Sequence, residues 1–309
     1  MHREIIVTMD ADTFAEPDAL IKMIHFFMEE NVMCVTPSMV INNPRTIWQR
    51  IQQIEYFLGV YLRKSFTSMR AVHVTPGAFS AYRKIFFERH GGFEVGNMTE
   101  DMEMALRIQL HDYDLECSDT SIVFTDSPRT FKELFIQRRR WYFGWMGNLW
   151  RYRKLFSKEY GDLGTIVLPT AVITITLSAV LTSYLAYSIL IKVKEELEIL
   201  RSLNFDITGL ATVDKFLVER YFYLLFSNPL FLTFLAFFAI MVIYMMFAKK
   251  RVKKHANVSL NLFLFIFIYG LLLTFWWITA GFYYLFVGDI KWRTKDKTQS
   301  RLNIKEENR

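Results

Sequence analysis

The sequence predicts an α/β domain followed by an amphipathic helix and an all-α apolar region. In the first half, short β-branched runs alternate with apolar residues at helical spacing, which is typical of a sheet covered by helices. The second half contains long stretches that are almost free of charge. We place the α/β domain at residues 1–130, the amphipathic region at 131–160, the apolar region at 161–290 and a basic tail at 291–309.

The composition indicates that part of the chain lies in or at a bilayer. Of its 309 residues, 52% are hydrophobic and 17% are aromatic. The net charge is +6, but the basic residues flank apolar segments and do not form a soluble patch. We therefore expect anionic lipid and an anionic substrate as partners, and no nucleic acid. Cys34 and Cys117 lack disulfide or zinc spacing, so buried thiols in a reducing compartment are expected.

The first half contains the predicted strands and helices. The first strand, residues 4–9, ends in Asp10-Ala11-Asp12, so two carboxylates project from the edge of the sheet where ligands bind in open α/β folds. The other expected strands are residues 32–41, 71–75, 78–83, 115–118 and 122–125, and helices are expected at 19–30, at 44–64 and after Thr99.

The Asp-x-Asp pattern occurs twice and carries little information by itself. Asp10 and Asp12 end a buried strand, whereas Asp112-Tyr113-Asp114 follows a helix, where a solvated turn is the simpler interpretation. For Asp10 and Asp12 two interpretations stay open. They hold Mg²⁺ or Mn²⁺ against a diphosphate, or they serve a turn or cap.

Thr99-Glu100-Asp101 begins a predicted helix. Thr99 is a candidate N-cap, and acidic residues in a first turn are favoured by the helix dipole. This stability argument accounts for Glu100 and Asp101 without any function. The functional alternative makes Asp101 a general base, which takes a proton from a hydroxyl group at the tip of the helix.

Residues 131–156 mix aromatic side chains with Lys and Arg at helical spacing, as an interfacial helix does. Within them, Gln137-Arg138-Arg139-Arg140-Trp141 sets three guanidinium groups between an amide and an indole. Guanidinium groups fit phosphate oxygens in pairs, and an indole face suits stacking on a sugar ring. The alternative is a helix that only anchors the domain.

Three apolar segments follow, at residues 164–191, 221–247 and 258–287, and each is long enough to span a bilayer, which takes about 20 residues. The basic run from Lys249 to Lys254 predicts a cytoplasmic loop, which places the first half of the chain in the cytoplasm as well. Three crossings then put the basic tail outside, against the same rule. Either the tail violates the rule, or one segment is a re-entrant hairpin.

Four motifs together resemble the processive membrane glycosyltransferases of family 2, the cellulose, chitin, hyaluronan and poly-N-acetylglucosamine synthases. The motifs are Asp10-x-Asp12, Pro76-Gly77-Ala78-Phe79, Thr99-Glu100-Asp101 and Gln137-x-x-Arg140-Trp141. Residues 77–83 and Gly91-Gly92-Phe93 look most similar to the poly-N-acetylglucosamine type. The resemblance implies part of a GT-A-type nucleotide-sugar transferase domain, which builds a β-linked polysaccharide at the cytoplasmic face of the plasma membrane.

The resemblance also implies roles for individual residues. Asp12, with Asp10 nearby, holds Mg²⁺ or Mn²⁺ on the diphosphate of a UDP-sugar, most simply UDP-N-acetylglucosamine. Asp101 deprotonates the acceptor hydroxyl, which attacks the anomeric carbon and inverts it. The residues implied to bind substrate are Gly77, Glu100, Gln137, Arg140 and Trp141.

One departure from the family concerns the segment before the metal-binding strand. In the family it holds uracil and ribose and follows amino-terminal membrane helices, but only nine residues precede Asp10 here. We therefore expect this chain to be the C-terminal part of a synthase, whose donor site an upstream segment or a partner subunit completes. A single-addition enzyme that glycosylates a lipid and a non-catalytic membrane fragment are the alternatives.

Overall fold

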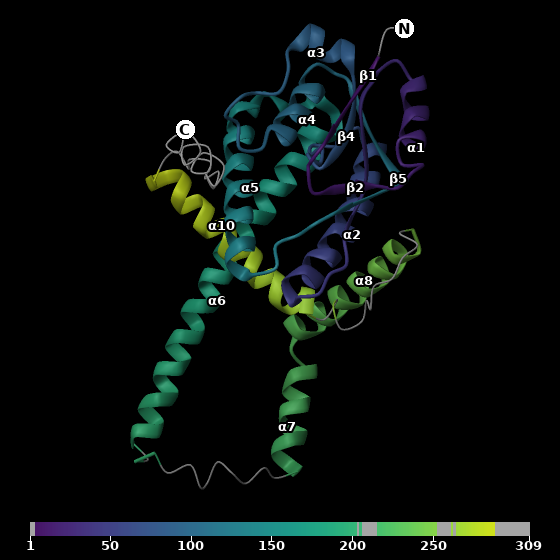
Figure 1. Cartoon of the computed structure of the whole chain (residues 1–309). Helices are drawn as coiled ribbons and strands as arrows, with labels where there is room; N and C mark the ends of the chain where they lie inside the picture. The colour runs from purple at the N-terminus through teal and green to yellow at the C-terminus, as the bar shows by residue number, and fades with distance from the viewer. Residues whose placement is uncertain (1–3, 203, 206–214, 252–260, 262–263, 288–309) are drawn as a thin grey trace, which may run out of the picture.

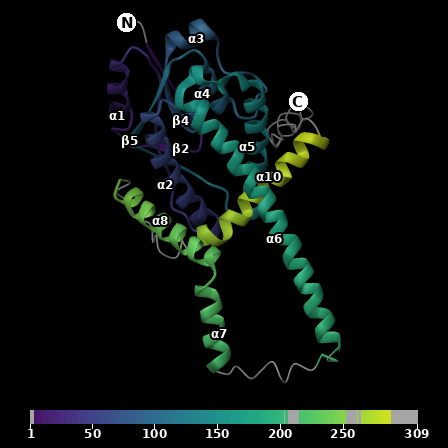
Figure 2. The ribbon, with the colours of Figure 1, turned by 180° about the vertical axis from the view of Figure 1, so that it is seen from behind.

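A computed structural model describes residues 4–202, 204–205, 215–251, 261 and 264–287 (Figure 1). A mixed sheet and its covering helices form one end of the molecule, and α6 (Leu168–Ser202) and α7 (Lys215–Phe226) project away from that end. The view from behind shows the same separation (Figure 2). The predicted order, an α/β domain followed by helices, is confirmed.

The sheet has five strands in the order β1-β4-β3-β5-β2. The strands are β1 (Ile5–Met9), β2 (Thr13–Ala15), β3 (Val32–Ile41), β4 (Phe79–Arg83) and β5 (Asp114–Thr125). β3 lies at the centre, parallel to β5 and antiparallel to β4, and all of its residues are buried. A strand buried on both faces has a continuous apolar run, which is why its sequence predicted it well.

Three predicted elements differ from the structure. The strands expected at 115–118 and 122–125 form the single strand β5, which shifts register opposite Pro37 and Ser38. The Ser38 hydroxyl donates to the carbonyl groups of Ser118 and Asp119 across this shift, at 3.3 and 3.0 Å. The helix expected at 19–30 is only α1 (Ile21–Ile24) and a 3₁₀ turn.

The strand expected at 71–75 is an irregular segment. Ala71 and Val72 are fully buried, Val72 in the core between the sheet and its helices, but neither residue pairs with a strand. The Val72 carbonyl accepts a hydrogen bond from the Gln109 side chain at 3.2 Å. Burial therefore explains the apolar run that predicted a strand, because periodicity cannot identify so short a segment.

Helices α2 (Ile47–Ser68), α3 (Lys84–His90), α4 (Glu100–Leu110) and α5 (Phe131–Arg151) surround the sheet. Capping boxes begin α2 at Thr46 and α5 at Thr130. In each, the threonine hydroxyl accepts from the backbone N–H of the third helical residue, whose side chain accepts from the threonine N–H. Thr99 precedes α4 as predicted, but its side chain makes no cap hydrogen bond.

A buried ion pair joins α5 to α2. The Arg138 side chain is 1% exposed, and its two terminal nitrogens donate to the two carboxylate oxygens of Glu55 at 2.5 and 2.6 Å. The guanidinium group also lies 4.4 Å from the ring centre of Trp141 and 5.7 Å from that of Trp276, which belongs to α10 (Gly270–Phe282). Helices α2, α5 and α10 therefore all contact the guanidinium group of Arg138.

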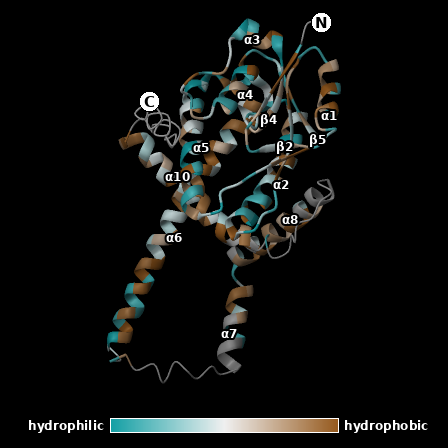
Figure 3. Cartoon of the chain, in the orientation of Figure 1, coloured by the Kyte–Doolittle hydropathy of each residue, from teal (hydrophilic) through white to brown (hydrophobic). Residues whose placement is uncertain are grey.

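Among the described residues, two helical stretches are long and apolar enough to cross a membrane, Leu163–Ser202 and Gly270–Val287. Hydrophobic residues run along α6 and α10, while α5 is mixed (Figure 3). The first predicted segment lies within the first of these stretches. The third predicted segment begins at residue 258, outside the described residues. Part of the run from Lys249 to Lys254 and the whole tail at 291–309 also lie outside them.

The second predicted spanning segment, residues 221–247, is not one helix. It is divided into α7 and α8 (Pro229–Arg251), which point in different directions (Figure 1). The break lies at Ser227 and Asn228, because Pro229 has no N–H and restricts the residue before it. α8 turns back along α2, where the Tyr244 and Tyr61 rings lie 4.7 Å apart.

We expect Glu55→Ala to lower the free energy of unfolding by about 3 kcal/mol, because it leaves the Arg138 charge buried without its partner. Glu88→Ala is the matched control. Glu88 pairs with Lys84 on the surface, and its loss should cost about 0.5 kcal/mol. Denaturant unfolding of the purified proteins measures both. Equal losses for the two variants would contradict a structural role for the buried pair.

Candidate active site

Asp10 and Asp12 lie in the turn between β1 and β2. The Asp10 N–H donates to the Ala78 carbonyl at 3.0 Å, and the Asp10 carbonyl accepts from the Thr13 N–H at 3.2 Å. These bonds attach the turn to the residue that precedes β4. Two motifs that are far apart in the sequence, Asp10-x-Asp12 and Pro76-Gly77-Ala78-Phe79, therefore lie side by side.

Asp101, in the first turn of α4, is held by the same loop. Its carboxylate accepts hydrogen bonds from the Gly77 N–H at 3.2 Å and from the Met102 N–H at 2.8 Å, while its backbone carbonyl accepts from the Thr75 hydroxyl at 2.5 Å. A Cβ atom on Gly77 would lie 3.5 Å from Asp101 Oδ2. Gly77 thus brings backbone close to the carboxylate, whose orientation is fixed from both sides.

The electrostatic surroundings connect these carboxylates to α5. Burial is the main reason that the pKa of Asp101 is raised to about 6, and the charge of Glu100 raises it further. Burial also raises the pKa of Asp10, and the charge of Asp12 adds to that effect. Arg140 lowers the pKa of both Asp10 and Asp101, so its guanidinium group is within electrostatic reach of both.

One face of α5 packs against the start of α4. Gly144 follows Arg140 by one turn, and a Cβ atom on Gly144 would lie 2.4 Å from the Thr99 hydroxyl oxygen. One turn further, the Asn148 amide donates to the Thr99 carbonyl at 3.1 Å and to its hydroxyl at 3.0 Å. This contact sets the distance between Arg140 and Asp101.

The predicted cluster of three guanidinium groups is not a single site. Successive helical residues point about 100° apart, so the three arginines go in different directions. Arg138 faces Glu55, Arg139 lies 4.6 Å from the Tyr283 ring centre, and Arg140 acts on the carboxylates. The three guanidinium groups therefore do not lie together, and of the three only Arg140 lowers the pKa of Asp10 and of Asp101.

The remaining predicted binding residues have varied surroundings. Glu100 is exposed and acts on Asp101 through its charge. Trp141 is half-buried against the guanidinium group of Arg138. The Oε1 atom of Gln137 is buried and accepts no hydrogen bond within the described part of the chain, although a buried carbonyl oxygen normally does. Gln137 thus has a capacity for a polar ligand.

Asp10 and Asp12 are the two carboxylates at this site that could hold a divalent cation. Their like charges raise the pKa of Asp10, and a divalent cation would relieve that repulsion. No group of three His, Cys, Asp or Glu side chains that could hold a metal occurs among the residues that the structure describes. Two carboxylates fit Mg²⁺ or Mn²⁺ shared with phosphate oxygens, and do not form an all-protein cage.

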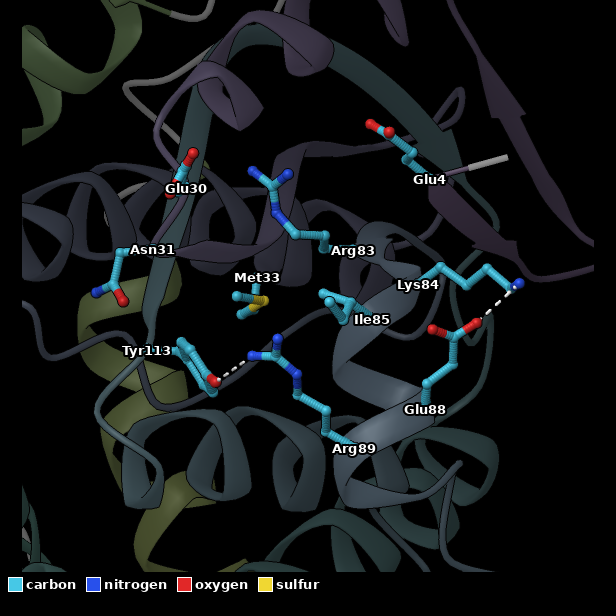
Figure 4. Close-up of a pocket in the computed structure, with 10 residues that line it drawn as sticks. All are labelled: Glu4, Glu30, Asn31, Met33, Arg83, Lys84, Ile85, Glu88, Arg89 and Tyr113. Atoms are coloured by element: carbon cyan, nitrogen blue, oxygen red, sulfur yellow. Dashed lines mark hydrogen bonds and ion pairs between the residues drawn. The ribbon is translucent and has the colours of Figure 1, made fainter. Parts of the chain in front are cut away.

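A pocket of about 720 Å³ lies at the opposite end of β1, beyond Glu4 (Figure 4). The guanidinium group of Arg89 reaches the Tyr113 hydroxyl at 3.3 Å, and Lys84 pairs with Glu88. None of the predicted site residues lines this pocket. Charges and hydrogen bonds, and not the size of a cavity, therefore locate the candidate active site.

A family model for glycosyl transferase family group 2 matches residues 5–288. The chain belongs to this family. The four motifs predicted this family membership. The match extends from the first strand through α10, so it includes the sheet, α5 and the apolar helices.

Curated relatives include two kinds of synthase. The chain is 27% identical over 189 residues to a beta-monoglucosyldiacylglycerol synthase of Trichormus variabilis, covering 57% of this chain and 40% of the relative. It is 28% identical over 141 residues to a poly-beta-1,6-N-acetyl-D-glucosamine synthase of Staphylococcus epidermidis, covering 45% and 34%. The chain thus aligns with less than half the length of either relative.

A solved mannosyltransferase of Pyrobaculum calidifontis, in complex with GDP-Man and Mn²⁺, aligns with 93% of this chain and 63% of its own length. The TM-score is 0.46 and the sequence identity is 14%.

Sequence reasoning missed several residues that position the site. Glu55 and Arg138 fix α5, while Gly144, Asn148 and Thr75 hold α4 next to it. The sequence does contain an indication for Gly144. A glycine inside a predicted helix lowers its stability, which suggests that a neighbouring element packs closely at that position. Glu55 gave another, because it is a charge within the apolar spacing of the predicted helix at 44–64.

We expect Gly144→Ala to destabilise the protein by about 1–3 kcal/mol, because the new methyl group would overlap Thr99 and push α5 away from α4. Gly147→Ala is the matched control in the same helix. Nothing lies within 4 Å of its added Cβ, so it should stabilise by up to about 1 kcal/mol. Unfolding midpoints test this pair. A loss at Gly147 equal to that at Gly144 would indicate that only helix propensity is involved.

Proposed function

We propose that this protein transfers N-acetylglucosamine from UDP-N-acetylglucosamine to a growing β-linked polysaccharide, with inversion, at the cytoplasmic face of a membrane. The observation that carries the proposal is the Asp101 carboxylate, which two backbone N–H groups hold near Arg140 and whose pKa is raised to about 6. A base of this pKa is ionised at neutral pH and accepts a proton more readily than an ordinary aspartate.

Asp101 acts on the acceptor. Its carboxylate takes the proton of the acceptor hydroxyl as the oxygen attacks the anomeric carbon, so that the new glycosidic bond forms while the bond to the diphosphate breaks. The hydrogen bonds from Gly77 and Met102 keep the carboxylate in one orientation before the reaction. Attack from the side opposite the leaving group inverts the configuration to a β linkage.

Arg140, Asp10 and Asp12 act on the donor. The Arg140 guanidinium group stabilises the charge that develops on the leaving UDP. Asp10 and Asp12 would hold Mg²⁺ or Mn²⁺, which neutralises the diphosphate when bound. Gln137, with its buried and unpaired Oε1, accepts a hydrogen bond from a sugar hydroxyl or amide group.

Two candidate functions differ in the acceptor of the sugar, which is either a polysaccharide or a lipid. Six of the curated relatives are named poly-beta-1,6-N-acetyl-D-glucosamine synthase and are 28% identical to this chain over 141 residues. They favour a polysaccharide acceptor, whose sugar ring would stack on the Trp141 indole. The longer match to a glucosyldiacylglycerol synthase favours a lipid acceptor. The products separate the two, because a singly glycosylated lipid is extracted into organic solvent and a polymer is not.

A membrane location is part of the proposal. It is supported by the two long apolar helical stretches, the first of which follows the amphipathic α5 in the chain. We place the α/β domain on the cytoplasmic side, where nucleotide sugars are made.

We expect the transfer rate of the full-length protein to rise with pH through about 6 and then to level, because only the ionised Asp101 accepts a proton. Asp101→Asn should lower kcat by about 10²–10⁴-fold without lowering the unfolding midpoint at pH 7, since burying this charge is unfavourable. Radiolabelled sugar transfer measures the rate.

Glu100→Gln provides an independent test of the same base. Removing this charge should shift the acid limb of the pH profile to lower pH, because Glu100 raises the pKa of Asp101. An Asp101→Asn enzyme with unchanged kcat, or a limb that Glu100→Gln does not move, would mean that another group is the base.

We expect chelation by EDTA to abolish transfer and Mg²⁺ or Mn²⁺ to restore it. Asp12→Asn should raise the cation concentration needed for half-maximal rate by about tenfold or more, because one of two carboxylate donors is lost. The matched control is Asp112→Asn in the second Asp-x-Asp, whose exposed side chain lies 3.5 Å from Arg70. A response of Asp112→Asn equal to that of Asp12→Asn would contradict the metal assignment.

A further inference from the structure

An apolar groove of about 780 Å³ is lined by residues of α5, α6 and α10. Figure 1 shows that these three helices come together beside the sheet domain. Its walls come from all three helices and are aromatic or aliphatic. The lining residues include Trp145, Trp150, Ile175, Ala179, Trp277 and Ile278. The volume lies within the range of about 300–1,000 Å³ that is usual for small-molecule sites.

The chemistry of the wall favours a hydrocarbon chain. Thr176 lines the groove, but its hydroxyl already donates to the Val172 carbonyl at 2.9 Å. Large apolar side chains are also exposed on α6 next to the lining residues in the sequence, with Ile173 at 64% and Leu177 at 63%. An occupant can therefore enter along an apolar helix surface.

One lining residue of the groove carries a positive charge. Arg153 lines the groove, exposed, with its guanidinium group 5.4 Å from the Trp150 ring centre and one nitrogen donating to the Trp150 carbonyl at 3.3 Å. These contacts use only part of the donor fork, which matches phosphate oxygens. An apolar slot with a guanidinium group beside indole rings is complementary to a lipid with an anionic headgroup.

We propose that this groove binds one acyl chain of an anionic phospholipid of the bilayer, with the lipid phosphate at Arg153. A chain gains little by leaving other lipid tails for an apolar groove. The charge at Arg153 and the shape of the groove must then supply the preference, so the site selects anionic over zwitterionic lipid. The inference does not depend on the transfer reaction.

Tryptophan fluorescence provides a direct readout, because Trp145, Trp150 and Trp277 line the groove. The full chain in detergent micelles is titrated with phosphatidylglycerol or phosphatidylcholine brominated on the acyl chain, since bromine quenches nearby indoles. We expect saturable quenching by the phosphatidylglycerol at a mole fraction at least about fivefold lower than by the phosphatidylcholine, in keeping with one charge-assisted contact.

Two pairs of variants test the parts of the site. Ala179→Phe fills the groove and should remove the saturable quenching, while Ala186→Phe, two turns further along α6 and outside the groove, should not. Arg153→Gln should remove the preference for phosphatidylglycerol, while Lys154→Gln, the adjacent exposed cation that does not line the groove, should keep it. Near-ultraviolet circular dichroism verifies that each variant is folded.

Three outcomes would overturn the proposal. Quenching that rises linearly and equally with both lipids would mean bulk lipid contact only. Saturable quenching that persists in folded Ala179→Phe would place the lipid elsewhere. Displacement of brominated phosphatidylglycerol by diacylglycerol at equal concentration would assign the groove to a neutral lipid.

Discussion

The ion pair between Arg138 and Glu55 fixes the rotation of α5, and the candidate active site depends on that rotation. Arg138 is almost fully buried between α2, α5 and α10, where it contacts the Glu55 carboxylate and two indole rings. An ion pair of this kind contributes little net stability compared with apolar packing, but its partners cannot be separated without a large cost. It therefore specifies one orientation of α5 over others.

The orientation of α5 brings functional side chains from distant parts of the sequence close to one another. With Arg138 directed to α2, Arg140 is directed to the carboxylates at the end of β1 and at the start of α4. Gly144 and Asn148 then hold α4 at close range through Thr99. The opposite side of α5 packs on α10, where the ring centres of Tyr142 and Trp277 lie 4.2 Å apart. The same helix thus connects the sheet domain to the apolar helices.

The sequence predicted those parts of the fold in which one signal dominates. The strand at 32–41 is buried on both faces, and α2 and α5 begin with capping boxes, so burial and local hydrogen bonds agree there. The strand predicted at 71–75 was wrong because its apolar residues are buried in the core without pairing with another strand. The single spanning helix predicted at 221–247 was wrong because Asn228-Pro229 divides the segment into two helices, as this dipeptide commonly does.

The candidate site was predictable in its residue types but not in its geometry. Asp10, Asp101 and Arg140 stood out by motif, whereas the partners that orient them did so only weakly. Gly77 near Asp101 and Glu55 near Arg138 are contacts between residues that are 24 and 83 positions apart. Such contacts follow from packing and leave no local periodicity. The three adjacent arginines illustrate the same limit, because helical rotation sends each to a different neighbour.

A structure of the full-length protein with UDP-N-acetylglucosamine and Mn²⁺ would test the central claim most directly. We expect the diphosphate to lie between Arg140 and the Asp10-Asp12 turn, with the anomeric carbon facing Asp101 and the Arg138–Glu55 pair unchanged. A nucleotide bound away from these residues, for example in the pocket beside Arg89 and Tyr113, would contradict the assignment of the site and of its base.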